Sequence, residues 1–206
     1  MDALSKHQIS CFYHDAYRLS CSLPHNNYLS NTQPKSYRTN HAAKASLIRS
    51  KETFMLAVGD TAPTTDIQTD TDHFCLARHD GKKMVIFFFP RADTAGCTKE
   101  ALQFSDLIED FANADAEVIG ISKDTPQKQA KFRAKYDLRC HLGSDCDTDI
   151  CEQFGVWVEK SMYGKTYLGV QRATFVIDAT GRVAAVWPKV KVNGHATDVL
   201  SFVQTI

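Results

Sequence analysis

Four short apolar runs punctuate the chain from residue 84 onward, and each has the length of a buried strand. The first is bounded by Lys83 and Pro90, so it is short and sharply limited on both sides. The last two are joined by Ala179-Thr180-Gly181, which predicts a hairpin. The four predicted strands span residues 84–89, 117–122, 172–178 and 182–187.

The segments around these runs have helical periodicity instead. Four apolar residues recur between Ala101 and Phe111 at the spacing of one helix face, and Pro126 favours the first turn of another helix. Asp124, just before that helix, is expected to contribute only to loop solubility. The predicted helices span residues 99–112, 125–136, 148–154 and 196–204. This order predicts an α/β fold in which a mixed central sheet is flanked by helices.

Residues 1–54 show neither periodicity. They are rich in Ser, Asn, His and Tyr and carry 7 basic and 3 acidic residues, which leaves +4 here and −4 on the other 152 residues. Such a segment buries too little apolar surface to offset its chain entropy. We therefore predict a disordered N-terminal extension over 1–54 and one domain over 55–206. Two alternatives stay open: the extension is an organelle-targeting segment, or Met55 is the biological start and 1–54 is not native.

Cys97 ends the segment Pro90-Arg91-Ala92-Asp93-Thr94-Ala95-Gly96-Cys97, directly after the first strand and ahead of a helix. The unpaired N–H groups and the dipole at a helix start favour a negative charge, and hence the thiolate. The Thr94 hydroxyl can hydrogen bond to sulfur and to substrate. Pro90 restricts the backbone where the strand ends. The segment predicts a nucleophilic cysteine.

Several segments, in matching order, resemble the peroxiredoxin family, specifically the peroxiredoxin Q group, also called bacterioferritin comigratory protein. The most specific is Pro90-x-x-x-Thr94-x-x-Cys97. The others are Met162-Tyr163-Gly164-Lys165 and residues 169–178 and 189–195. The resemblance runs from Val58 to the last helix. It implies a thioredoxin-like fold and the reduction of hydrogen peroxide and organic hydroperoxides by thiols, in antioxidant defence and redox homeostasis.

The resemblance also implies residue roles. Cys97 matches the peroxidatic cysteine, Thr94 and Pro90 the residues packed around it, and Arg172 the activating arginine. Attack by the Cys97 thiolate on a peroxide oxygen gives sulfenic acid, and hydrogen-bond donors would stabilise the developing charge. Glu100, one turn after Cys97, either satisfies the helix dipole or orients Arg172.

The cysteine that would resolve the sulfenic acid is missing from its usual positions. Relatives carry it five residues after the peroxidatic cysteine, where this chain has Leu102, or in the next helix, where it has Arg133. We therefore expect an external thiol, such as thioredoxin or glutathione, to reduce the sulfenic acid. The alternative is an internal cysteine, with Cys146 in a polar loop as first choice and Cys140 as second.

Composition and charge limit the kinds of partner, compartment and cofactor expected for this protein. Balanced charge, with 24 basic and 24 acidic residues, gives no indication of nucleic acid, and the apolar runs are far shorter than the roughly 18 residues of a membrane span. Seven cysteines, an odd number, and no visible secretory signal favour a reducing, cytoplasmic compartment. Cys140, His141, Cys146 and Cys151 do not match zinc spacings, so we expect no metal and no cofactor. We expect a monomer or a weak dimer.

Three other functions compete with a thiol peroxidase. A thiol–disulfide oxidoreductase needs C-x-x-C, and Thr94 stands where the first cysteine would be. A glutathione peroxidase places Gln and Trp about its nucleophile, whereas Trp157 and Trp187 lie in other contexts. A peroxide sensor or holdase would use Cys97 oxidation as a switch. Fast peroxide consumption with turnover separates an enzyme from such a switch.

Overall fold

The structure is a computed structural model that describes residues 54–76, 81–162 and 164–206. All but the last residue of the predicted extension 1–54 therefore lies outside the described residues, as does Tyr163 of the third motif. The strands are β1 Asp66–Thr69, β2 His73–Cys75, β3 Lys83–Phe88, β4 Ala116–Ser122, β5 His141–Ser144, β6 Trp157–Met162, β7 Lys165–Val170, β8 Ala173–Ile177 and β9 Val183–Trp187. The helices are α1 Ala95–Asp106, α2 Ile108–Asn113, α3 Pro126–Tyr136, α4 Ile150–Gln153 and α5 His195–Val203.

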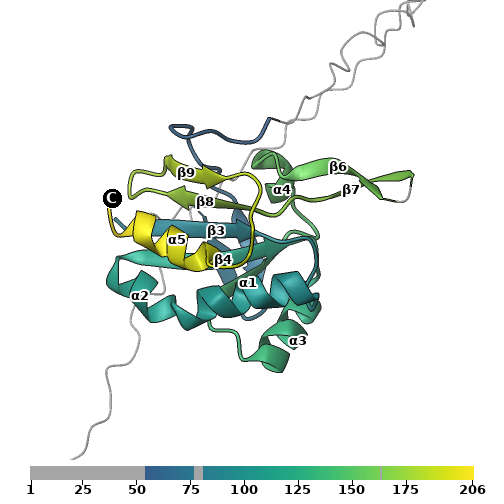
Figure 1. Ribbon diagram of the computed structural model, residues 1–206, viewed down its shortest axis with the longest axis horizontal. Coiled ribbons are helices and arrows are strands. Elements are labelled where there is room, and N and C mark those ends of the chain that lie inside the picture. The colour runs from purple at the N-terminus through teal and green to yellow at the C-terminus, as the bar shows by residue number, and fades with distance from the viewer. Residues whose placement is uncertain (1–53, 77–80, 163) are drawn as a thin grey trace, which may run out of the picture. The chain divides into compact units, whose positions relative to one another are not determined.

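Seven strands form the central sheet in the order β2-β1-β5-β4-β3-β8-β9 (Figure 1). Strands β3, β4 and β5 run parallel, whereas β8 is antiparallel to both β3 and β9. The predicted mixed sheet and the hairpin of its last two strands are confirmed. Strands β6 and β7 form a separate two-stranded sheet that projects from the body (Figure 1).

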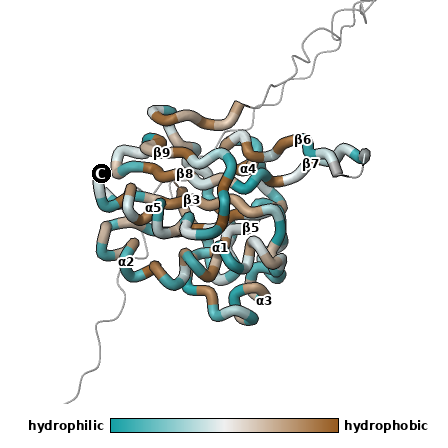
Figure 2. Tube along the Cα trace, in the orientation of Figure 1, coloured by the Kyte–Doolittle hydropathy of each residue, from teal (hydrophilic) through white to brown (hydrophobic). Residues whose placement is uncertain are grey.

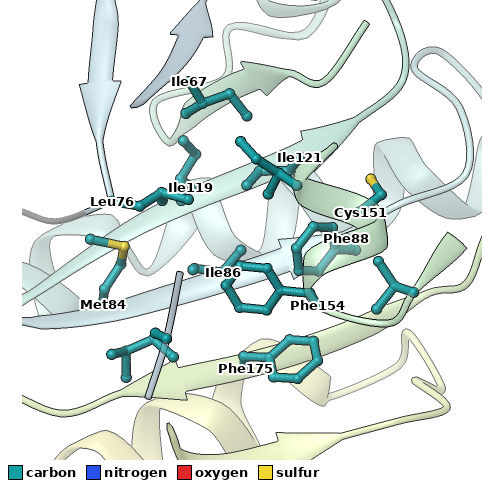
Figure 3. Packing of buried hydrophobic residues seen from close by; sticks show 14 of the residues in the cluster. Ile67, Leu76, Met84, Ile86, Phe88, Ile119, Ile121, Cys151, Phe154 and Phe175 are labelled. Carbon is teal, nitrogen blue, oxygen red and sulfur yellow. The ribbon is translucent and has the colours of Figure 1, made fainter. Parts of the chain in front are cut away.

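The sheet buries both of its faces, because alternate residues of a strand point to opposite sides. Val85 and Phe87 of β3 pack with α1, α2 and α5, and Ile86 and Phe88 pack with α4 on the other face. Figure 3 shows the second face, where the rings of Phe88 and Phe175 surround Phe154 at centroid distances of 5.1 and 5.0 Å. Hydrophobic residues gather along these central strands (Figure 2). The chain thus forms three layers, helix–sheet–helix.

The first helix is positioned by an aromatic stack. Phe104 of α1 lies against Phe87 of β3, with ring centroids 4.5 Å apart and an interplanar angle of 13°. Such a pair contributes about 1 kcal/mol beyond the area it buries. The stack holds α1 against the sheet and therefore places the residues at its N-terminus.

The predicted helix 99–112 is wrong in two respects. It begins earlier, at Ala95, so Cys97 is the third residue of α1 and does not precede the helix. It also breaks at Leu107, which separates α1 from α2. Next to the break, the Arg139 guanidinium donates a hydrogen bond of 3.4 Å to the Asp106 carbonyl oxygen. This oxygen thus accepts a hydrogen bond from outside the helix at the point where α1 ends. No helix among residues 54–76, 81–162 and 164–206 is long and apolar enough to cross a membrane.

Candidate active site

The candidate nucleophile lies at the edge of the sheet where its parallel strands end. The loop 90–94 follows β3 and leads into α1, while Asp124 follows β4 and Cys146 follows β5. Because β3, β4 and β5 are parallel, these three segments meet at their carboxyl ends. This edge is where open α/β sheets place their ligands.

Strand pairing brings Arg172 to the same edge. Strand β8 is antiparallel to β3, and its first residue, Ala173, pairs with Phe88, the last residue of β3. Arg172 therefore stands immediately beside the start of the loop that carries Cys97. Its Nη2 donates to Cys97 Sγ at 3.1 Å. The guanidinium is a charged donor, so this hydrogen bond places a fixed positive charge beside the candidate nucleophile.

Burial makes this contact stronger than a surface pair would be. Cys97 is 1 % exposed and belongs to the hydrophobic cluster between the sheet and α1. A Cβ on Gly96 would lie 3.4 Å from Arg172 Nη2, an ordinary van der Waals contact, so the approach of the guanidinium does not require a glycine at this position.

Glu100 lies one turn beyond Cys97 on α1 and forms an ion pair with Arg172 Nη1 through its Oε2. The carboxylate is 1 % exposed, and its Oε1 has no hydrogen-bond partner among the described residues. Burial raises the pKa of Glu100 to about 7, although Arg172 opposes the shift. Of the two roles expected for Glu100, this contact favours orienting Arg172. One guanidinium thus binds Glu100 with one nitrogen and Cys97 with the other.

Thr94 and Pro90 occupy the loop as expected, but the threonine hydroxyl does not donate to sulfur. Thr94 is the N-cap residue of α1, with extended backbone, and its Oγ1 donates to the Arg91 carbonyl at 3.1 Å. The oxygen keeps a free lone pair, because a hydroxyl that donates one hydrogen bond still accepts others. Thr94 and Pro90 are both exposed, on the surface of the loop that leads to the buried Cys97.

Asp124 anchors the active-site loop, and the expectation that it serves only loop solubility is wrong. Its side chain is 8 % exposed, and its Oδ2 accepts the Ala92 N–H at 2.7 Å and the Ser122 hydroxyl at 3.0 Å. Charge-assisted bonds to a buried carboxylate are among the stronger hydrogen bonds in proteins. The loop is therefore tied to the end of β4.

A second anchor ties the loop to α3. Asp93 adopts a left-handed backbone conformation with φ of 60° and accepts hydrogen bonds from Lys135 Nζ at 2.9 Å and from the Tyr136 hydroxyl at 2.6 Å. These bonds lower the pKa of Asp93. Such a φ is unfavourable for most residues and is tolerated by Asp. The strained position is thus held by partners from α3.

Lys160 of β6 is a further cation that sequence reasoning missed. It is partly buried and donates to the Val170 carbonyl at 2.6 Å. Burial lowers its pKa, and the positive charge of Arg172 lowers it further, while the charge of Cys97 opposes the shift. The β6–β7 hairpin thus adds positive charge to the side of the site that carries Arg172.

The two candidate resolving cysteines lie away from Cys97. Cys140 is 0 % exposed and its sulfur accepts the Ser105 hydroxyl at 3.5 Å. Ser105 lies eight residues along α1 from Cys97, which corresponds to about 12 Å of helix. Burial raises the pKa of Cys140, which keeps it protonated and weakens it as an attacking group.

Cys146 is exposed and follows β5, two strands away from β3 in the sheet. Neighbouring strands are about 4.8 Å apart, so the two strand ends are about 10 Å apart. A disulfide needs Cα atoms within about 7 Å. All five cysteines of the described residues are free thiols. Cys140 therefore lies beyond disulfide distance of Cys97, and Cys146 follows a strand that is two places away from β3.

Both usual positions of a resolving cysteine hold residues with structural contacts. Leu102 packs against the cluster that contains Cys97. Arg133 forms an ion pair with Asp70, whose side chain is 1 % exposed, and donates to the carbonyls of Leu138 at 2.6 Å and Cys140 at 2.9 Å. Within residues 54–76, 81–162 and 164–206, no three His, Cys, Asp or Glu side chains gather as a metal site would need.

Known proteins match most of this chain. The profile of the AhpC/TSA family matches residues 58–186. The chain is 44 % identical over 146 residues to the putative peroxiredoxin bcp of Coxiella burnetii, which covers 70 % of this chain and 97 % of that protein. It is 39 % identical over 146 residues to the peroxiredoxin Bcp of Bacillus subtilis, with coverage of 70 % and 93 %.

Solved structures show the same likeness. A structure of the bacterioferritin comigratory protein of Xanthomonas campestris, studied for its alkyl peroxide reduction activity, aligns with a TM-score of 0.68 and 37 % identity. It covers 73 % of this chain and 98 % of that one. The peroxidoxin BcpB of Mycobacterium tuberculosis aligns with a TM-score of 0.65 and 35 % identity, covering 74 % and 99 %.

Proposed function

The chain belongs to the AhpC/TSA family and is a thiol peroxidase, a peroxiredoxin of the Bcp type with a thioredoxin-like fold, and from this premise we propose that Cys97 is its peroxidatic nucleophile. The observation that carries the proposal is the hydrogen bond of 3.1 Å from Arg172 Nη2 to the buried Cys97 Sγ. No other described cysteine has an arginine donor on its sulfur. The predicted switch or holdase is not favoured by the comparisons.

The first half of the proposed cycle is a substitution at oxygen. The Cys97 thiolate attacks the terminal peroxide oxygen, the S–O bond forms, the O–O bond breaks, and hydroxide or alkoxide leaves and takes a proton from solvent. Cys97 becomes sulfenic acid and the peroxide becomes water or an alcohol. The Arg172 fork faces the sulfur and stabilises charge that moves toward the oxygens. Thr94 Oγ1 accepts a hydrogen bond from the O–H of the incoming hydroperoxide, and that proton stays on the oxygen that Cys97 gains.

Glu100 acts in this proposal as a positioning residue. Its ion pair with Arg172 Nη1 leaves Nη2 directed at sulfur, so the guanidinium has one orientation when both partners are present. Burial of the pair against α1 excludes water that would screen it. Asp124 acts further away, by holding the Ala92 backbone and thus the loop.

The second half of the proposed cycle uses an external thiol, with thioredoxin or another thiol as reductant. Leu102 and Arg133 occupy the usual resolving positions, and the contacts of Cys140 and Cys146 support the same route. Organic hydroperoxides are proposed as substrates beside hydrogen peroxide, in line with the activity studied in the Xanthomonas campestris protein. Function as a monomer or weak dimer is part of the same proposal. The free cysteines favour the reducing cytoplasm.

The test is the replacement of the nucleophile. Cys97→Ser should abolish peroxide consumption while the circular dichroism spectrum stays unchanged, because a serine alkoxide does not form at neutral pH. Cys75→Ser, at a partly buried cysteine outside the site, is the control and should keep the normal rate. More than a few per cent of the wild-type rate in Cys97→Ser would exclude Cys97 as the nucleophile.

A further inference from the structure

A basic cavity of about 420 Å³ lies between the active-site loop and α3, and no step of the cycle described so far uses it. Four cations border it: Arg91 from the loop, and Lys128, Lys131 and Lys135 from α3. Phe132 supplies its apolar base. The volume lies within the range of pockets that take small ligands. We call this pocket the basic cavity.

The three lysines face the cavity because of their spacing. Positions 128, 131 and 135 recur at three and four residues, so they share one face of the helix. Phe132, 1 % exposed, lies beneath them, and its ring centroid is 6.1 Å from that of Phe89, which belongs to the same buried cluster as Cys97. Phe132 therefore connects the cavity to the buried cluster beneath the active-site loop.

Only half of the positive charge is neutralised within the protein. Lys135 pairs with Asp93 at 2.9 Å, and Lys128 pairs with Asp124 at 3.5 Å. Both carboxylates also accept other hydrogen bonds, Asp93 from the Tyr136 hydroxyl and Asp124 from the Ala92 N–H.

Arg91 and Lys131 form no ion pair among the described residues, so two cations at the cavity are unpaired. Two unpaired cations over an apolar base suit a small molecule with two carboxylates and a short apolar body.

We infer that the basic cavity binds the carboxylate end of the thiol that reduces sulfenic Cys97, a low-molecular-weight thiol carrying two carboxylates. The inference rests on the proposed function, since it needs a sulfenic acid at Cys97. Arg91 and Lys131 bind the carboxylates.

The separation between the basic cavity and the loop that leads to Cys97 suits a thiol of peptide size. A tripeptide in extended form spans about 10 Å. The cavity wall at Arg91–Asp93 belongs to the loop that enters α1, and Asp93 stands only four residues before Cys97. A thiol held at the cavity by its carboxylates is thus delivered across the loop toward the sulfur.

The step balances without any further reactant. The thiol sulfur attacks the sulfur of sulfenic Cys97, an S–S bond forms, the S–O bond breaks, and the oxygen leaves as water with the thiol proton and the sulfenic proton. A second molecule of the thiol then attacks the mixed disulfide, which releases Cys97 as a thiol and the oxidised ligand as its disulfide. Two thiols are oxidised for each peroxide reduced.

The experiment separates the reductive step from the oxidative one in the full-length protein. Sulfenic acid is formed with one equivalent of hydrogen peroxide, and its reduction is then followed with glutathione, glutathione monoethyl ester or uncharged 2-mercaptoethanol. In Arg91→Gln/Lys131→Gln, loss of two cations should slow reduction by glutathione about tenfold at low salt, reduction by the ester less, and reduction by 2-mercaptoethanol not at all. Lys165→Gln, an exposed lysine of the β6–β7 hairpin, is the charge-matched control and should behave as wild type.

Ionic strength gives a second readout. The glutathione rate of the wild type should fall as salt rises from about 0.01 to 0.5 M, and the 2-mercaptoethanol rate should not. An unchanged glutathione rate in the double variant, or an equal loss with both thiols, would overturn the inference. A loss confined to turnover with thioredoxin would also overturn it, because the cavity would then serve a protein reductant. Failure of the proposed function is distinguishable, because it would appear as absent sulfenic acid in every protein.

Discussion

Arg172→Lys tests the electrostatics of the site most directly, because it keeps the charge and removes the planar fork. Arg172 Nη1 pairs with Glu100 while Nη2 lies 3.1 Å from Cys97 Sγ. A single ammonium group has no rigid geometry with which to serve both partners. We expect the lysine to stay with the buried Glu100 carboxylate and to lose its hydrogen bond to sulfur.

The size of the effect follows from the bond that is lost. Hydrogen bonds to charged groups contribute about 1.5–3 kcal/mol, and Arg172 is 18 % exposed, so solvent screens the bond only partly. At 1.36 kcal/mol for each factor of ten, the rate of Cys97 with peroxide should fall about 10- to 150-fold at pH 7.

The rate constant for hydrogen peroxide is measured at pH 7 by competition with horseradish peroxidase. Arg182→Lys is the control, since Arg182 is exposed and donates to the Gly59 carbonyl outside the site. A rate of Arg172→Lys with hydrogen peroxide that stays within threefold of wild type would refute the electrostatic role.

Three further predictions concern the Glu100–Arg172 ion pair, the predicted N-terminal extension and the reduction of sulfenic Cys97. Glu100→Gln should slow peroxide reduction above pH 7, where the wild-type carboxylate is charged. The rates of the variant and the wild type should converge as the pH falls through about 7. A ratio of these two rates that stays constant across pH 5.5–8.5 would count against the positioning role. A chain that begins at Met55 should melt within about 3 °C of the full chain and turn over normally, because Met55 packs against the core whereas the predicted extension carries none of the site. Cys140→Ser and Cys146→Ser should each keep thioredoxin-coupled turnover near normal. Melting curves control for loss of stability at the buried Cys140. Loss of turnover in one variant, with its first reduction of peroxide intact, would identify a resolving cysteine.

The sequence was most informative where a residue's neighbours along the chain decide its surroundings. The apolar run 84–89 predicted β3, and the loop after it predicted a nucleophile beside a helix start. Short strands escaped prediction, because β5 has only Leu142 as a large apolar residue and β1 has only Ile67. In these strands the partner strands, and not the local pattern, decide the structure.

Contacts between distant segments account for what the sequence did not reveal at the site. Asp124 looks like any polar loop residue, yet the Ala92 N–H reaches it across 32 positions of sequence. Lys160 comes near Arg172 only because the β6–β7 hairpin folds toward it. The role of Arg172 itself came from the family resemblance, since its contact with Cys97 spans 75 positions. Periodicity carries no information at such separations.

The ion pair of Arg133 with Asp70 bears on how oxidised states of this protein can be observed. Arg133 joins α3 to the residue that follows β1 and to two carbonyls near the start of β5, and removing one partner of such a buried pair costs about 3–5 kcal/mol. These contacts of α3 involve neither Cys97 nor Arg172, so conversion of the thiol to sulfenic acid breaks none of them. Crystals of the reduced protein should accept peroxide and then thiol by soaking without cracking, so that successive states are recorded within one lattice.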